Sequence, residues 1–195
     1  HMSAAGPLDT TRTPHARLRT LPLDGVTLGR GFWSRRQATN REASLQHGYR
    51  MLEQAGNFHN FRLVTGQAQG DYRGRLFMDE NVYKWLEAVA YALAASPDAA
   101  LRVMADNAIG LIAAAQQPDG YLNTYFTVVE PQQRWADLDH GHELYCAGHL
   151  FQAAIAFHRA LGDARLLNIA TRLADHIASV FGPAKRDGAP GHPEI

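Results

Sequence analysis

The chain is organised around the stretch HELYCAGHLFQAAIAFHRAL, residues 142–161. Its apolar and small side chains recur at the spacing of one buried helical face, at Leu144, Gly148, Phe151, Ile155 and the stem of His158. Gly162 is a typical left-handed stop for a helix, and Asp163 is a typical N-cap for the next one. The sequence therefore predicts a core helix with titratable groups at its start, and Gly148 predicts a closely approaching neighbour helix.

A metal site on this helix has to be considered, because His142, Cys146 and His149 share one face. At about 1.5 Å of rise per residue, the outer two backbones lie roughly 10 Å apart, whereas ligands of one zinc lie within about 2.3 Å of the metal. One ion is therefore not expected to take all three, although a pair could still chelate. We interpret Cys146 as a small buried hydrophobe and His149 as a hydrogen-bonded core or helix-packing histidine.

Length and composition limit the classes of protein. A chain of 195 residues with 46% hydrophobic content can bury a sizeable core and is expected to form one domain, or two at most. The 19 basic and 19 acidic residues balance, which argues against a nucleic acid or an anionic membrane as partner. The single cysteine excludes an internal disulfide and fits a reducing, cytoplasmic location. We expect neither a membrane span nor a signal peptide.

The first residues are set apart from the fold. His1-Met2 looks like the scar of a cleaved tag, and residues 1–16 are interpreted as a disordered lead-in ahead of one domain over residues 17–195. Residues 18–28 alternate leucine and valine with polar residues, which indicates a short strand or an extended arm.

Four more helices are predicted from apolar periodicity and stop signals. They cover residues 34–54, 79–95 with Asp79 as the N-cap, 98–117 with Asp98 at its start, and 164–181. The aromatic and β-branched residues 121–129 suggest an extended segment or a short strand pair. Residues 191–195 are typical of the start of another helix. This is an all-α chain of helical hairpins, as in a toroid or a solenoid, and the lack of a sequence repeat weakens the solenoid.

Several motifs carry a resemblance to a known family. They are Phe32-Trp33-Ser34, Asn60-Phe61-Arg62, VYKWLEA at 82–88, QPDGYLNTY at 117–125, HELYCAGHL at 142–150 and GHPEI at 191–195. Together they resemble the N-terminal part of the catalytic barrel of the β-L-arabinofuranosidases, glycoside hydrolase family 127. The resemblance implies the first helical hairpins of an (α/α)6 barrel, incomplete in this chain and truncated before the barrel closes.

The resemblance also implies the chemistry. Family members are retaining hydrolases that release a terminal furanoside with a zinc-bound cysteine nucleophile and a glutamate acid/base. These residues are expected beyond Ile195, because Cys146 matches neither the nucleophile nor a zinc ligand. We therefore expect no catalytic residue, metal or cofactor in this segment, zinc in the full-length parent, and no activity for the 195 residues alone.

The resemblance assigns sugar binding to this part of the barrel. Gln46, His142 and His192 align with residues that line the furanose subsite, and imidazole and amide groups can both donate to and accept from sugar hydroxyls. A helix that runs out and a partner that runs back return the chain to the same end, so His142 and His192 are predicted to converge at one mouth of the barrel. The expected partners are a small carbohydrate, L-arabinofuranose or a related sugar of plant-type glycans, and the remainder of the barrel.

Two other functions stay open on the sequence alone. One is a helical carbohydrate-binding or interaction module. The other is a different (α/α)-barrel sugar enzyme, such as an unsaturated-uronyl hydrolase or an epimerase, in which helix-borne histidines also line the pocket.

Overall fold

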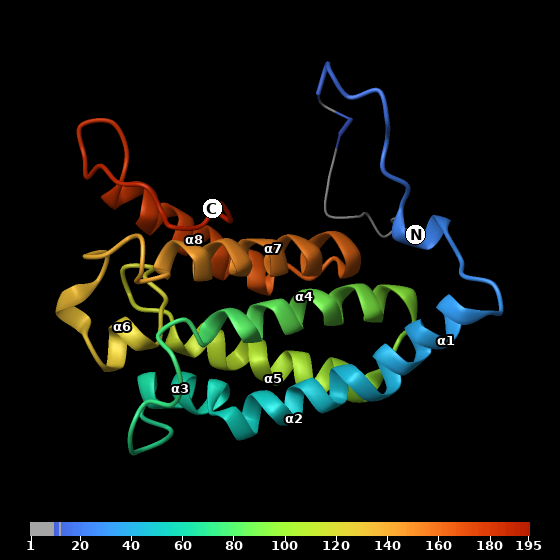
Figure 1. The fold of residues 1–195 in the computed structure, drawn as a ribbon, viewed down its shortest axis with the longest axis horizontal. Coiled ribbons are helices and arrows are strands. Elements are labelled where there is room, and N and C mark those ends of the chain that lie inside the picture. Colours follow the sequence, from blue (N-terminus) through green and yellow to red (C-terminus); the bar gives the residue numbers. More distant parts are fainter. Residues whose placement is uncertain (1–9, 12) are drawn as a thin grey trace.

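The computed structural model describes residues 10–11 and 13–195, and over this part of the chain the architecture is helical (Figure 1). The α-helices are α1 Phe32–Thr39, α2 Leu45–Ala55, α3 Asn57–Val64, α4 Asp79–Ala95, α5 Ala99–Ala115, α6 Tyr125–Val128, α7 Glu143–Leu161 and α8 Arg165–Val180. A π-helical turn, Asn40–Ser44, joins α1 to α2, and short 3₁₀ turns lie at Leu23–Gly25 and Pro131–Gln133. The predicted lead-in, residues 1–16, lies for the most part outside the described residues.

Helices α4 and α7 form the centre of the arrangement. They lie side by side and run in the same direction, while α5 and α8 run back along them (Figure 1). Tight connections make this return possible, since Asp98 caps α5 by accepting from Leu101 N at 3.0 Å and Gly162 ends α7 with a φ of 70°. The N-terminal ends of α4 and α7 therefore meet at one end of the bundle, together with the long loops.

The buried side of α7 differs from the predicted one. Leu144 and Gly148 are buried as expected, but Ile155 is 39% exposed and His158 is exposed. The helix packs on α4 and α8 instead through a face rich in alanine, made of Leu150, Ala153, Ala154, Ala156, Phe157 and Ala160. Alanines allow two helices to approach closely on two sides, which simple apolar spacing does not reveal.

Several connections also differ from expectation. Residues 57–64 form the unpredicted helix α3, which buries Phe58 and Phe61 directly after the left-handed Gly56. Residues 125–128 form α6 rather than a strand, and the N-terminal arm contains no strand in its described part. Asp79 is not a capping group, because its carboxylate is buried and turned to Thr124. Residues 191–193 form bends and 194–195 are irregular, so the predicted start of another helix is wrong.

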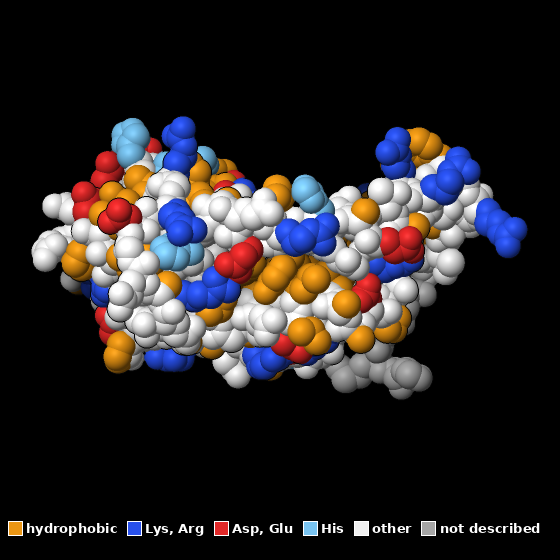
Figure 2. Space-filling model, turned by 90° about the horizontal axis from the view of Figure 1, so that it is seen from below, with side chains coloured by type: hydrophobic (Ala, Val, Ile, Leu, Met, Phe, Trp, Pro, Cys, Tyr) orange, Lys and Arg blue, Asp and Glu red, His pale blue; other side chains and the backbone are white. Residues whose placement is uncertain are grey.

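The surface carries charges of both signs. On the face of Figure 2, Lys and Arg side chains alternate with Asp and Glu across the helical body, around exposed hydrophobic side chains. Arg62 and Glu53 are one such pair, with an N–O distance of 2.6 Å. Within the described residues, no helix is long and apolar enough to cross a membrane.

Candidate functional site

The candidate site lies where α7 begins. His142 is the N-cap residue of α7 and has a left-handed backbone with a φ of 57°. Its Nδ1 lies 2.5 Å from the carbonyl oxygen of His140, and its Nε2 lies 3.2 Å from Nε2 of His192. The predicted convergence of the two histidines is therefore confirmed, although 50 residues separate them in sequence.

The hydrogen-bond partners assign the donor and acceptor roles of the two rings. The His140 carbonyl can only accept, so Nδ1 of His142 carries the proton and its Nε2 is an acceptor. Nε2 of His192 must then be the donor between the two rings. The site thus presents one imidazole N–H beside one imidazole lone pair, which is the combination that a hydroxyl group can satisfy from both sides.

A loop segment rather than a helix carries His192. Gly191 N donates to the Leu138 carbonyl at 3.3 Å, and Nδ1 of His192 lies 3.7 Å from the Glu194 carboxylate. The backbone of Glu194 packs directly on Gly148 of α7, where an added Cβ would lie 2.7 Å from the Glu194 carbonyl carbon. Gly148 does permit a close approach, but the neighbour is this segment and not the predicted helix.

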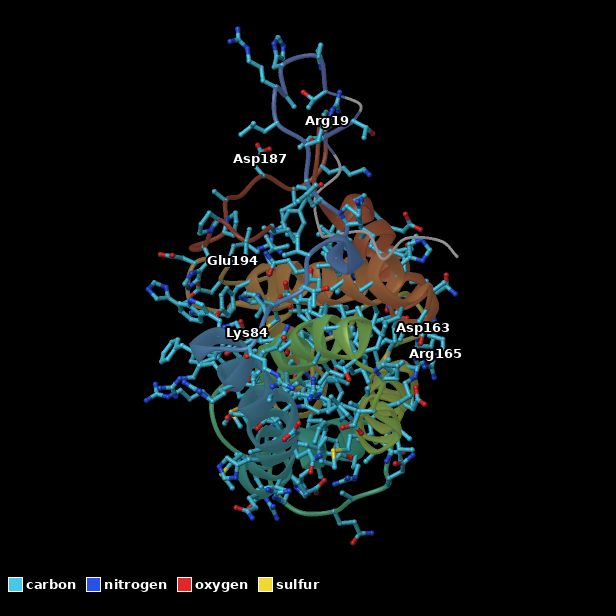
Figure 3. All side chains as sticks on the ribbon, turned by 90° about the vertical axis from the view of Figure 1, so that its right-hand side faces the viewer. Arg19, Lys84, Asp163, Arg165, Asp187 and Glu194 are labelled. Carbon is cyan, nitrogen blue, oxygen red and sulfur yellow. The ribbon has the colours of Figure 1, made fainter. Side chains whose placement is uncertain are left out.

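The floor of the site is Tyr145, one turn into α7. Its ring centroid lies 4.5 Å from that of His192 and 5.6 Å from that of His142. Lys84 of α4 donates to the Tyr145 hydroxyl at 2.7 Å and pairs with Glu80 at 2.6 Å. Figure 3 shows Lys84 and Glu194 on the same side of the molecule, away from the ion pair of Asp163 and Arg165.

A buried carboxylate anchors the residue next to His142. Glu143 is 4% exposed, accepts from the Tyr121 hydroxyl, and accepts from Trp135 N at 2.6 Å. Burial raises the pKa of Glu143 to about 7, against the lowering effect of the Tyr121 hydrogen bond. Trp135 itself has a left-handed φ of 60°. Glu143 therefore ties the preceding loop to the start of α7 and is not free to act on a substrate.

A second buried carboxylate lies at the start of α4. Asp79 is 1% exposed and accepts from Thr124 N at 2.8 Å and from the Thr124 hydroxyl at 2.5 Å. Burial raises its pKa to about 6. Like Glu143, it fixes a loop to a helix start.

The other two candidates on α7, Cys146 and His149, are buried and form hydrogen bonds to residues outside the histidine pair. Cys146 is 2% exposed and its sulfur lies 3.9 Å from the Phe77 carbonyl oxygen. Burial raises the pKa of its thiol well above the ordinary value. Nδ1 of His149 lies 3.2 Å from the Gln152 side-chain oxygen, and burial lowers the pKa of His149. In the described part of the chain no group of three His, Cys, Asp or Glu side chains could hold a metal ion.

The third predicted site residue lies apart. Gln46 is half-buried on α2, and no interaction between described residues joins it to His142 or His192. Its role in sugar binding stays a prediction.

Sequence reasoning missed Tyr145, Lys84 and Glu80. Tyr145 follows His142 by three residues and Lys84 follows Glu80 by four, and this spacing could have indicated that each pair shares a helix face.

The fold class follows from the arrangement of the helices. The inner helices α4 and α7 run parallel, their partners α5 and α8 run back behind them, and the polar loops gather at one end. This is part of an (α/α)6 barrel. The family profile described as "Beta-L-arabinofuranosidase, GH127 catalytic domain" matches residues 25–195. The chain therefore belongs to this family.

Individual relatives agree with this assignment. A non-reducing end β-L-arabinofuranosidase from Bifidobacterium longum subsp. longum is 35% identical over 197 residues, covering 87% of this chain and 30% of the relative. A solved GH127 β-L-arabinofuranosidase from Geobacillus stearothermophilus matches with a TM-score of 0.84 and 43% identity, over 87% of this chain and 28% of its own. A solved GH127 β-arabinofuranosidase matches with a TM-score of 0.81 and 30% identity, over 88% and 29%. The chain thus spans about 30% of the curated relative.

Proposed function

We propose that this chain is the sugar-binding part of a retaining glycoside hydrolase that releases terminal L-arabinofuranose, or a related sugar, from plant-type glycans. The observation that carries the proposal is the histidine pair, with its two Nε2 atoms 3.2 Å apart at the loop end of the helices. The named activities of the relatives favour this function over a stand-alone binding module and over an unsaturated-uronyl hydrolase or epimerase.

The pair can bind a sugar hydroxyl in one defined way. A hydroxyl that enters between the rings accepts from the Nε2–H of His192 and donates to Nε2 of His142, which otherwise accepts from His192. One hydrogen bond between the imidazoles is thereby replaced by two to the sugar. Both rings are half-buried, so these bonds form where water is partly excluded.

The zinc that the family resemblance implies does not fit the residues described. Cys146 is the single cysteine, and it is buried, which raises the pKa of its thiol and disfavours the thiolate that zinc binds. Glu143 and Asp79 are already occupied by Tyr121, Trp135 and Thr124. We therefore assign no chemical step to a metal here, and we propose that the nucleophile and the acid/base lie outside these 195 residues. A cytoplasmic location stays a prediction.

The test is a pair of alanine variants in the full-length protein. With para-nitrophenyl β-L-arabinofuranoside as substrate, we expect His142→Ala and His192→Ala each to weaken transition-state binding by about 1–3 kcal/mol, measured as kcat/KM. His158→Ala is the matched control, because His158 is exposed on the same helix α7, and it should keep full activity. The 195 residues alone should be inactive. Full kcat/KM in both site variants would show that the pair does not bind the sugar.

A further inference from the structure

The Tyr145 ring contacts three imidazoles, those of His142, His149 and His192. Its ring is tilted by 40° against His192, and it meets His142 and His149 edge to face, at interplanar angles of 87° and 88°. The His149 ring centroid is 4.6 Å away. Tyr145 therefore packs against both members of the histidine pair, and Phe77 packs on His142 as well, at 5.0 Å between ring centroids.

A chain of polar contacts holds Tyr145 in turn. The Lys84 ammonium donates to its hydroxyl at 2.7 Å and also lies 5.1 Å from the ring centroid. Glu80 holds the same ammonium at 2.6 Å, and its own side chain is only 8% exposed. These contacts join α4 to α7 at the one end where the site lies. Contacts to both the ring and the hydroxyl restrict the rotamers that Tyr145 can adopt.

His192 depends on such a support more than His142 does. His142 belongs to the start of a helix, whereas His192 lies in the irregular segment after α8, residues 181–195. An imidazole on irregular backbone rotates about its side-chain torsions unless packing restrains it. The face of the Tyr145 ring, with centroids 4.5 Å apart, is the nearest aromatic restraint on His192.

We propose that Tyr145 is a positioning residue of the site, which orients the His192 imidazole toward His142, and that Lys84 and Glu80 fix Tyr145 for this task. The inference rests on the proposed function, since the imidazoles must bind substrate for their orientation to affect activity. Tyr145 itself does not have to touch the sugar.

The experiment is a double-mutant cycle in the full-length protein, with kcat, KM and thermal unfolding measured for each variant. Tyr145→Leu removes the ring, and His192→Ala removes the group that the ring is proposed to orient. We expect Tyr145→Leu to lower kcat/KM roughly tenfold in the native background and less than about twofold in the His192→Ala background, because residues that act through one another are not additive. If the double variant lost kcat/KM by the product of the two single losses, the proposal would be overturned.

Tyrosine-to-phenylalanine variants separate the hydroxyl from the ring. Tyr145→Phe and Lys84→Met should each lower kcat/KM about two- to fivefold, less than the loss of the ring, and the two losses should not multiply. Tyr91→Phe on α4 is the control, because the Tyr91 hydroxyl has no hydrogen-bond partner among the described residues, and it should leave kcat/KM unchanged. Full activity in Tyr145→Leu would overturn the inference. Full activity in His192→Ala would instead overturn the proposed function.

Discussion

Gly148→Ala is expected to disable the histidine pair while most of the fold stays intact. A Cβ added at Gly148 would lie 2.7 Å from the Glu194 carbonyl carbon and 3.0 Å from the Glu194 Cβ. Carbon atoms rest in contact at about 3.5–4.0 Å, so the segment that carries His192 has to retreat by roughly 1 Å. The Nε2 atoms of the pair are 3.2 Å apart, and a retreat of that size displaces the His192 N–H from the position in which it would donate to a sugar hydroxyl held by His142.

The steric overlap between the added Cβ and Glu194 should also change the free energy of unfolding. Alanine is favoured over glycine inside a helix by about 0.5–1 kcal/mol, whereas overpacking costs about 1–3 kcal/mol. Gly148→Ala should therefore lower the free energy of unfolding by a net amount between about 0 and 2.5 kcal/mol, the difference between these two ranges.

The assay compares Gly148→Ala with Gly110→Ala in the full-length protein. Gly110 is exposed on α5, and an added Cβ there meets nothing within 4 Å. The control should gain about 0.5–1 kcal/mol in stability at full activity, whereas Gly148→Ala should resemble His192→Ala in kcat/KM. If Gly148→Ala kept full kcat/KM and gained as much stability as Gly110→Ala, the close approach of residues 191–195 to α7 would be refuted.

Two further predictions concern buried groups. Because the folded pKa of Asp79 is raised from 3.8 to about 6, the stability that this group contributes is fully present below pH 3.8 and is lost as the pH rises through 6, a change of about 3 kcal/mol. The free energy of unfolding in urea should therefore differ less between pH 4 and pH 7 in Asp79→Asn than in the native chain. An equal difference in both would contradict this. Cys146 is buried with a raised thiol pKa, so a thiol reagent should label it only on unfolding; labelling at the rate of a free thiol would contradict the burial.

Local signals in the sequence were sufficient for the long helices. The helix α5 begins directly after Asp98, and Gly162 ends α7, as predicted; Asp98 caps α5, because such preferences arise from neighbouring backbone groups. The same reasoning failed for Asp79, which resembles an N-cap in sequence but hydrogen-bonds to Thr124, 45 residues away. A residue that can satisfy a local partner or a distant one cannot be assigned by local pattern alone.

The site was predictable to a different extent. The convergence of His142 and His192 followed from helices that run out and back, which is a property of topology. Tyr145 was not found, because a tyrosine three residues after a histidine is ordinary on a helix, and its meaning comes from Lys84 on another helix. The predicted face of α7 was partly wrong for a similar reason, since Ile155 is exposed where alanines make the contact.

The backbone of His142 shows what the site requires of this position. A left-handed conformation, here with a φ of 57°, costs a residue with a Cβ about 1–2 kcal/mol, and glycine or asparagine would adopt it more easily. The conformation turns Nδ1 to the His140 carbonyl, which fixes the tautomer, and it leaves Nε2 to face His192. The Glu143 carboxylate, bound to Tyr121 and Trp135, keeps the next residue in place against this strain. Replacement of His142 by asparagine should therefore relax the backbone and stabilise the fold in urea unfolding, while it removes the imidazole Nε2 that we propose accepts from the sugar. Stability and kcat/KM should then change in opposite directions.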